Sequence, residues 1–232
     1  MKLSTQPSSP ESRSSWTGQW CSSKIVTGSC HPRSMGWVFR STCVVCTEPG
    51  AVICRACWHG LDPPATEGPA ALFAYSGTGR EVVAALKFRG RRVLAPFLGP
   101  ALAELAGPDI DVVTWAPTSR ARRVARGFDQ AEGLARATAK ALCVPWRRCL
   151  NRSGGPSQTG RDRLERRVGP TFSAALQLGD DMIGRRVLVI DDVVTTGATL
   201  QAAGRTLLEA GFGSVDFVVV AKTARIVPNS RW

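Results

Sequence analysis

The apolar positions of residues 70–224 change between two spacings along the chain. Short continuous apolar runs are typical of strands buried on both faces, and spacings of three and four residues are typical of helices packed by one face. The apolar runs predict strands over 111–117, 186–192 and 215–224. The helical spacing predicts helices over 79–88, 93–105, 128–142 and 197–211.

This alternation predicts an α/β domain over residues 71–225, with a mostly parallel sheet flanked by helices, because helical crossovers join parallel strands. The Pro-rich segment "LDPPATEGPA" (61–70) is typical of a linker, and residues 226–232 are predicted to be a tail. Residues 1–40 are rich in serine and show no sustained period. We predict that they are disordered, or that they are a spurious extension from a wrongly chosen start codon.

Charge is the one feature of the composition that changes this picture. With 44% hydrophobic and 21% charged residues, the 232-residue chain is ordinary for a globular protein. Its net charge of +12 is not ordinary, and residues 115–167 hold 13 basic and 4 acidic residues. This concentration predicts a phosphate-rich partner, either a phosphorylated metabolite or a nucleic acid. The alternative is a solvated basic surface.

The sequence also indicates a compartment. No apolar run reaches the ~20 residues that span a bilayer, and the N-terminus lacks the apolar stretch of a signal peptide. We therefore expect a cytoplasmic protein without membrane insertion. In that compartment the eight cysteines are better explained as metal ligands or free thiols than as disulfides.

Four of these cysteines form a compact unit within residues 41–60, "CVVCTEPGAVICRAC". Cys43 and Cys46 repeat the spacing of Cys54 and Cys57. Each CxxC turn directs two thiolates to one point, so two turns predict a four-sulfur zinc knuckle that is structural because no ligand position stays open. A redox-active CxxC or plain buried cysteines are the alternatives, and His59 is a weaker substitute ligand.

The segment "VLVIDDVVTTGATLQAAG" (187–204) places two carboxylates, Asp191 and Asp192, directly after an apolar run. We predict that they lie at the carboxyl edge of a central strand, where open α/β sheets hold ligands. A turn rich in threonine and glycine then leads into a helix, and backbone amides at a helix N-terminus favour an anion. The pattern is neither a Walker loop nor GxGxxG. It indicates a site for a ribose phosphate, whose hydroxyls donate to carboxylates.

This segment resembles the phosphoribosyl-pyrophosphate (PRPP) motif of type I phosphoribosyltransferases. Together with "WAPTSRARRVARGFDQA" (115–131), "SQTGRDRLERR" (157–167) and the double CxxC, it resembles the ComF/GntX-like family of competence-associated proteins, from Cys43 to about Ala224. The resemblance implies a type I phosphoribosyltransferase-like fold with an N-terminal zinc knuckle. Asp129 departs from it, since the family usually has asparagine there, and the family's asparagine is also missing from "VGPTF" after Arg167.

The resemblance also implies roles for particular residues. Asp191 and Asp192 would bind the ribose hydroxyls and favour the cationic ring of the transition state. The 5′-phosphate would be bound by the turn residues Thr195, Thr196, Gly197, Ala198 and Thr199. The pyrophosphate would be bound by Thr118, Ser119, Arg120 and Arg126. Gln158 and Arg163 lie in the segment that resembles the loop covering the site. Magnesium would be held mainly by ligand oxygens.

Two functions follow. The first is PRPP-dependent transfer of phosphoribosyl to a nitrogenous acceptor with release of pyrophosphate. The second is a competence or DNA-processing factor that binds single-stranded DNA or a helicase partner without turnover, and a PRPP-responsive regulator lies between them. Phe73 and Tyr75 are the sequence's candidates for contacting a base, and Trp115 and Trp146 are predicted to be buried. Lys87 and Arg89 are interpreted as a basic helix end. The oligomeric state stays open.

Overall fold

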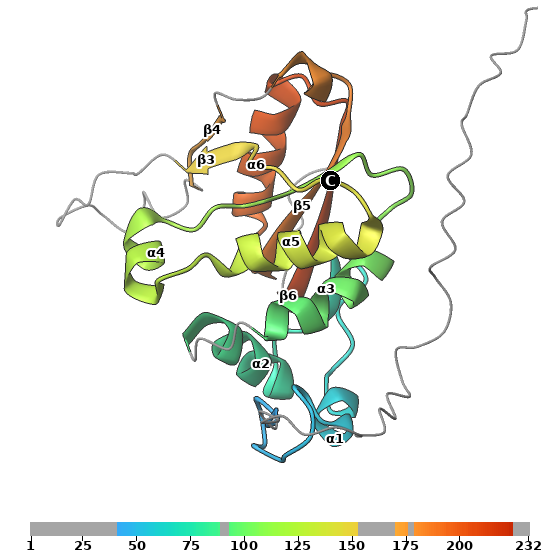
Figure 1. The fold of residues 1–232 in the computed structure, drawn as a ribbon, viewed down its shortest axis with the longest axis vertical. Helices are drawn as coiled ribbons and strands as arrows, with labels where there is room; N and C mark the ends of the chain where they lie inside the picture. Colours follow the sequence, from blue (N-terminus) through green and yellow to red (C-terminus); the bar gives the residue numbers. More distant parts are fainter. Residues whose placement is uncertain (1–40, 89–92, 153–169, 176–178, 225–232) are drawn as a thin grey trace, which may run out of the picture. The chain divides into compact units, whose positions relative to one another are not determined.

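The main sheet contains four parallel strands in the order β1-β6-β5-β2, of which β5 and β6 are labelled in Figure 1. They are β1 (Ala70–Ala74), β6 (Ser214–Lys222), β5 (Arg186–Val194) and β2 (Val112–Trp115). The computed structural model describes residues 41–88, 93–152, 170–175 and 179–224, which belong to one unit of the chain. The predictions for residues 1–40 and 226–232 lie outside these residues. The parallel sheet confirms the predicted α/β class.

Helices cover both faces of this sheet. Leu188 and Ile190 of β5 belong to one apolar core together with residues of α2 (Gly77–Phe88), α3 (Leu94–Glu104) and α5 (Gln130–Leu142). Val187 and Val189 belong to a second core with α6 (Ala198–Glu209) and a small antiparallel hairpin. This hairpin joins β3 (Leu150–Arg152) and β4 (Phe172–Ala174). The alternation along β5 follows from the strand, in which neighbouring side chains point to opposite faces.

Helices α3 and α5 approach closely enough to require a glycine. A Cβ atom at Gly99 would lie 2.5 Å from the Cβ atom of Ala137, a distance that real side chains do not reach. The close approach lets the two helices form one layer over the sheet (Figure 1). The carboxyl end of the sheet is therefore bordered by the N-terminus of α5.

The cysteine unit packs on α2. Val44 and Ile53 are buried in the same core as Val82 and Val83 of α2. The short helix α1 (Arg55–His59) begins next to Cys54. The segment between this unit and β1 is also held to the sheet, because the buried Nζ of Lys222 donates to the carbonyl oxygens of Glu67 (3.0 Å) and Pro69 (3.1 Å).

The structure contains all three predicted strands and all four predicted helices, with small differences at their ends. Strand β5 continues two residues past the predicted end at Asp192, to Val194. The remaining elements were not predicted: α1, β1, the hairpin β3–β4, the helix α4 (Arg120–Arg126) and the 3-10 turn η2 (Asp180–Met182). Within the described residues, no helix has the length and apolar character needed to cross a membrane.

Candidate functional site

The two acidic residues of β5 lie just beyond the point where the neighbouring strand β2 ends. Strand β2 pairs with β5 only up to Trp115 and Ile190, whereas β6 continues alongside β5 to Val194. Asp191 and Asp192 therefore lie beside the loop that follows β2. Because side chains alternate along a strand, they point to opposite faces of the sheet.

Asp192 points toward α2 and α5 and is only 7% exposed. Its Oδ1 lies 3.1 Å from the Nζ of Lys87, and its Oδ2 accepts a hydrogen bond of 2.8 Å from the Nε2 of Gln130. Both oxygens thus have protein donors, which differs from the predicted pair of carboxylates facing one ligand. A carboxylate oxygen has two lone pairs, so a further donor can still be accepted. The predicted contact of Asp192 with ribose hydroxyls stays a prediction.

Asp191 points toward the turn before α6. It lines a small pocket of about 30 Å³ with the predicted phosphate-binding residues, which are Thr195, Thr196, Gly197, Ala198 and Thr199. Burial raises the pKa of the Asp191 carboxyl well above its usual value, and the charge of Asp192 raises it further. The backbone N–H of Asp192 donates to Asp191 Oδ1 at 2.7 Å, which opposes this shift.

The turn owes its shape to Gly197. This residue has a φ of +78°, in the left-handed region that favours glycine, and it directly precedes α6. The N-cap residue Gly197 offers no capping side chain, and of the amides in the first turn that of Ala198 donates weakly to the hydroxyl of Thr196 at 3.4 Å. Amides of a helix N-terminus without a side-chain cap are suited to an anionic ligand.

The loop after β2 is held by Asp129. Its Oδ2 accepts from the backbone N–H of Thr118 (3.0 Å), and its Oδ1 accepts from the N–H of Ala131 (3.1 Å), which caps α5. Ser119 caps α4 through a weak bond from the N–H of Arg122 (3.4 Å). Asparagine has one acceptor oxygen, so the aspartate lets two different oxygens accept these two bonds.

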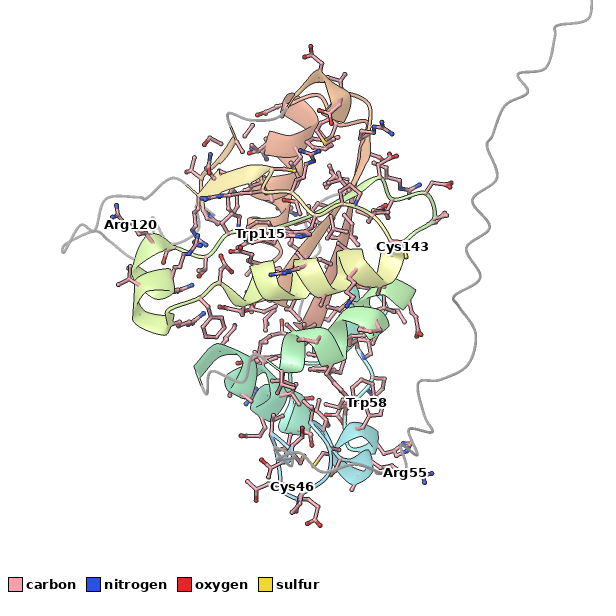
Figure 2. The ribbon with its side chains drawn as sticks, viewed as in Figure 1. Cys46, Arg55, Trp58, Trp115, Arg120 and Cys143 are labelled. Atoms are coloured by element: carbon pink, nitrogen blue, oxygen red, sulfur yellow. The ribbon has the colours of Figure 1, made fainter. Side chains whose placement is uncertain are left out.

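Arginines surround the space next to this loop. A pocket of about 610 Å³ is lined by Thr118 and Asp129 and by four arginines, which are Arg120, Arg123, Arg148 and Arg152. Figure 2 shows Arg120 on α4. Guanidinium groups match phosphate oxygens in shape and charge. The pocket is therefore suited to a pyrophosphate group.

Arg152 lines this pocket and is held by the loop after β2. Its Nη1 donates to the carbonyl oxygen of Pro117 (3.3 Å). Burial and the charge of Arg122 lower the pKa of Arg152, while the charges of Asp191 and Asp129 raise it. Arg152 lies at the end of β3, a strand that sequence reasoning missed because it is only three residues long.

The four cysteines of the N-terminal unit come together as predicted. Their Sγ atoms all lie within 4.8 Å of one another, and those of Cys46 and Cys54 are 3.5 Å apart. A tetrahedral zinc site with Zn–S distances of about 2.3 Å has sulfurs about 3.8 Å apart, so the spacing fits zinc.

Local electrostatics favour a thiolate in this cluster. Burial would raise the pKa of the Cys43 thiol, but hydrogen bonds from the backbone of Cys54, Cys46 and Val45 lower it to about 6. Burial and the neighbouring thiols raise the pKa of Cys57 to about 12. Four thiolates at this spacing repel one another, and a divalent metal ion would offset that repulsion.

The structure does not describe three of the predicted residues, which are Gln158, Arg163 and Arg89. Two others do not line the two pockets described above. Phe73, a candidate for contacting a base, is 1% exposed in the core. Arg126 lies at the end of α4 and does not line the arginine pocket.

One interpretation of a single residue was wrong. Trp146, predicted to be buried, is 39% exposed and packs its ring on buried Trp115 at 5.8 Å. Lys87 lies in the last turn of α2, as predicted for a basic helix end, and it also pairs with Asp192. The only sequence signal for this ion pair was that Lys87 lies one helical turn beyond the buried residues of α2. That position alone does not identify Asp192 as the partner.

Parts of this chain are similar to known proteins. Residues 150–229 match the phosphoribosyl transferase domain family. The competence protein ComFC of Bacillus subtilis is 29% identical over 179 residues, which is 73% of this chain and 72% of that protein. ComFC of Streptococcus pneumoniae is 30% identical over 145 residues, which is 61% of this chain and 62% of that protein.

The chain has a ComF-like phosphoribosyltransferase fold. In the described residues of this ComF-like chain, the four-cysteine cluster lies before β1, the first strand of the sheet. Among solved structures, the glutamine PRPP amidotransferase from B. subtilis has a TM-score of 0.42 at 22% identity, over 59% of this chain and 30% of that one.

Proposed function

We propose that this protein binds PRPP with magnesium and transfers the phosphoribosyl group to a nitrogenous acceptor, releasing pyrophosphate. The observation that supports it best is the pocket formed by Asp191 and the turn 195–199, at the carboxyl end of the sheet where the loop after β2 lines a second pocket with four arginines. The 5′-phosphate would bind the turn and the N-terminus of α6. The pyrophosphate would bind the arginine pocket.

The reaction needs charge more than it needs a nucleophile from the protein. The bond between C1 of the ribose and the pyrophosphate oxygen breaks, a bond between C1 and an acceptor nitrogen forms, and the acceptor loses a proton. Arg120, Arg123 and Arg152 would stabilise the negative charge on the leaving group, while Asp191 would favour positive charge on the ring. Magnesium, when bound, would neutralise charge on the pyrophosphate and be held mainly by ligand oxygens.

Calorimetry with PRPP and magnesium tests this function. Asp191→Asn removes the carboxylate that lines the phosphate turn, so we expect its affinity for PRPP to fall at least about tenfold, the loss expected for a charged hydrogen bond. The control is Asp180→Asn, since Asp180 is exposed at the opposite end of β5. A wild-type protein that does not bind PRPP, or an Asp191→Asn variant with wild-type affinity, would contradict the proposal.

A second function has some support from the surface. The competence relatives and the exposed arginines of α4, which include Arg120, Arg122 and Arg123, are compatible with a protein that binds single-stranded DNA. Trp146, which is exposed and lies beneath the guanidinium of Arg136 of α5 at 5.8 Å, offers an aromatic ring beside a further arginine. Bases stack on such rings in single-strand binding proteins.

A further inference from the structure

Helix α3 has no polar side chain before its last residue, Glu104, although one of its faces is exposed. This outer face consists of Pro96, Phe97 and Pro100. A surface helix normally presents polar residues to water, and a helix that is apolar all round is normally buried. Phe97 is 39% exposed, and its ring packs edge-on against exposed Trp58 of α1 at 5.8 Å. Among the described residues, the outer face of α3 is therefore an apolar surface that no element covers.

A groove of about 640 Å³ runs between this face and α5. Pro96 and Pro100 form one wall, and Arg136 and Lys140, one helical turn apart on α5, form the other. Ala137, which is half-buried where α5 meets α3, lies at the floor. All four wall residues are exposed, so the groove opens to solvent on the side of the helix layer that faces away from the sheet.

The charge of the groove has one sign. Neither Arg136 nor Lys140 forms an ion pair with another described residue, and the guanidinium of Arg136 lies over the ring of Trp146 at 5.8 Å. Interacting protein surfaces place opposite charges against each other. Two cations beside an apolar wall therefore favour an occupant that has carboxylates on one flank and apolar residues next to them.

The shape of the groove favours a helix as that occupant. Both walls are helices, whose backbone groups bond internally, so an extended segment would find no backbone partners there. A helix satisfies its own backbone groups and packs against neighbouring helices at distances of about 8–10 Å. The lining residues of α5 run from Gly133 to Ala141, which is ~12 Å along the helix axis. The groove is therefore long enough for about two turns of a helix.

We propose that this groove binds an acidic amphipathic helix of a partner protein, with its apolar residues on the α3 wall and its carboxylates next to Arg136 and Lys140. Charge argues against this chain as the occupant. A second copy of the groove brings the same two cations, and residues 1–40 contain five basic residues and one acidic residue. No residue that lines the arginine pocket or the pocket of the phosphate turn lines the groove, so the proposed PRPP site and this surface are separate.

The test uses a fluorescent peptide that a hydrocarbon staple holds helical, with leucines along one face and glutamates on the flank beside them. Its binding to the full chain is measured by fluorescence anisotropy. We expect saturable binding. A second peptide, with lysine in place of each glutamate, should bind at least about tenfold more weakly because its charges repel those of the groove.

Three variants locate the binding in the groove. Lys140→Glu should weaken binding of the glutamate peptide about tenfold and strengthen binding of the lysine peptide, because it reverses one charge of the wall. Arg205→Glu makes the same change of charge at an exposed residue of α6 and should leave both affinities within twofold of wild type. Ala141→Trp adds bulk without charge at an exposed lining residue, so it should weaken binding of the glutamate peptide about tenfold. Urea unfolding with a wild-type midpoint shows that each variant is folded.

Several results would overturn the proposal. They include no saturable binding, equal affinity for the two peptides, and equal effects of Lys140→Glu and Arg205→Glu. Self-association of the chain in sedimentation velocity that Ala141→Trp abolishes would identify a second copy as the occupant instead. Binding of an oligothymidine that Lys140→Glu weakens and Arg205→Glu does not would assign the two cations to a nucleic acid instead. None of these measurements involves PRPP, so the proposed function is tested separately.

Discussion

Asp191 and Asp192 differ in their surroundings although they are adjacent in the sequence. Asp192 is paired with Lys87 and Gln130, so its charge is balanced inside the protein. For Asp191 the described residues offer the N–H of Asp192 and the more distant charges of Lys87 and Arg152, and burial still raises its pKa well above the usual value. A carboxylate kept in an unfavourable environment is common at binding sites, where function opposes stability.

This difference predicts how stability depends on pH. A carboxyl whose pKa is raised in the folded state binds protons more tightly when folded, so stability is highest below its unfolded pKa and falls as pH rises through the folded pKa. Asp191→Asn removes that loss. We expect the variant to be more stable than wild type at pH 7.5 without ligand, with a difference that shrinks as the pH falls toward 4. Urea unfolding across this range, with Asp180→Asn as control, measures it.

The opposite result would be informative. If Asp191→Asn is less stable than wild type at pH 7.5, then Asp191 is a structural carboxylate with favourable contacts, and its assignment to ligand binding loses its support.

At the scale of elements, burial decided what the sequence could predict. Strands β2, β5 and β6 are apolar runs buried on both faces, which is the pattern that sequence reads most directly. Helix α4, "RARRVAR", was missed because it buries no residue and so has no apolar face. Strands β3 and β4 were missed because three residues are too few for a period.

The site was predictable to the same extent. The turn 195–199 and the four cysteines are local patterns, so the order of residues along the chain and the resemblance it carries indicate them. Lys87 and Gln130 reach Asp192 from α2 and α5, and only the tertiary arrangement brings them there. These contacts could not be predicted because the contacting residues are far apart in the sequence, whatever their residue types.

The cysteine unit permits a prediction with an internal control. Cys46→Ser should reduce zinc from one ion per chain to nearly none, because a four-sulfur site loses a ligand. Residues 41–60 should then lose their protection from proteolysis, since the metal supplies stability on the order of 10 kcal/mol to such small units. Cys143 is an exposed cysteine at the end of α5, apart from Cys46 (Figure 2), so Cys143→Ser should retain the metal. Elemental analysis and limited trypsin digestion measure both effects.

Equal zinc content in the two variants would contradict the four-cysteine site. Zinc lost from both would point to ligands shared between the unit and Cys143, which the geometry does not favour.

At the scale of the whole molecule, positive charge is concentrated rather than spread. Of the net charge of +12, most comes from residues 115–167, which include α4 and the arginine pocket. Such a field attracts anions from solution and accelerates their binding whichever anion is bound. Charge alone therefore does not distinguish a PRPP site from a nucleic-acid surface. The dependence of binding affinity on salt concentration does distinguish them.

Binding of an oligothymidine to the protein should show that dependence if the DNA function holds. A contact with ~6 phosphates of a single strand gives a slope of about −4 in a plot of log affinity against log salt concentration. Arg122 is exposed on α4 and does not line the arginine pocket, so Arg122→Ala should reduce the slope by about 0.7. Arg205→Ala, an exposed arginine on α6, is the control. Fluorescence anisotropy between 50 and 300 mM salt measures both, and a flat response would exclude this function.

The extension of β5 beyond Ile190 restricts how this motif can vary. Since the acids sit inside a paired strand, inserting or deleting one residue ahead of them would exchange their environments. Asp192, which now meets Lys87, would then face the turn. The charge of Asp191 would lie among the helices on the other face. Length changes can be accommodated after Val194, in the turn or the loops, but the span from Arg186 to Val194 has a fixed count.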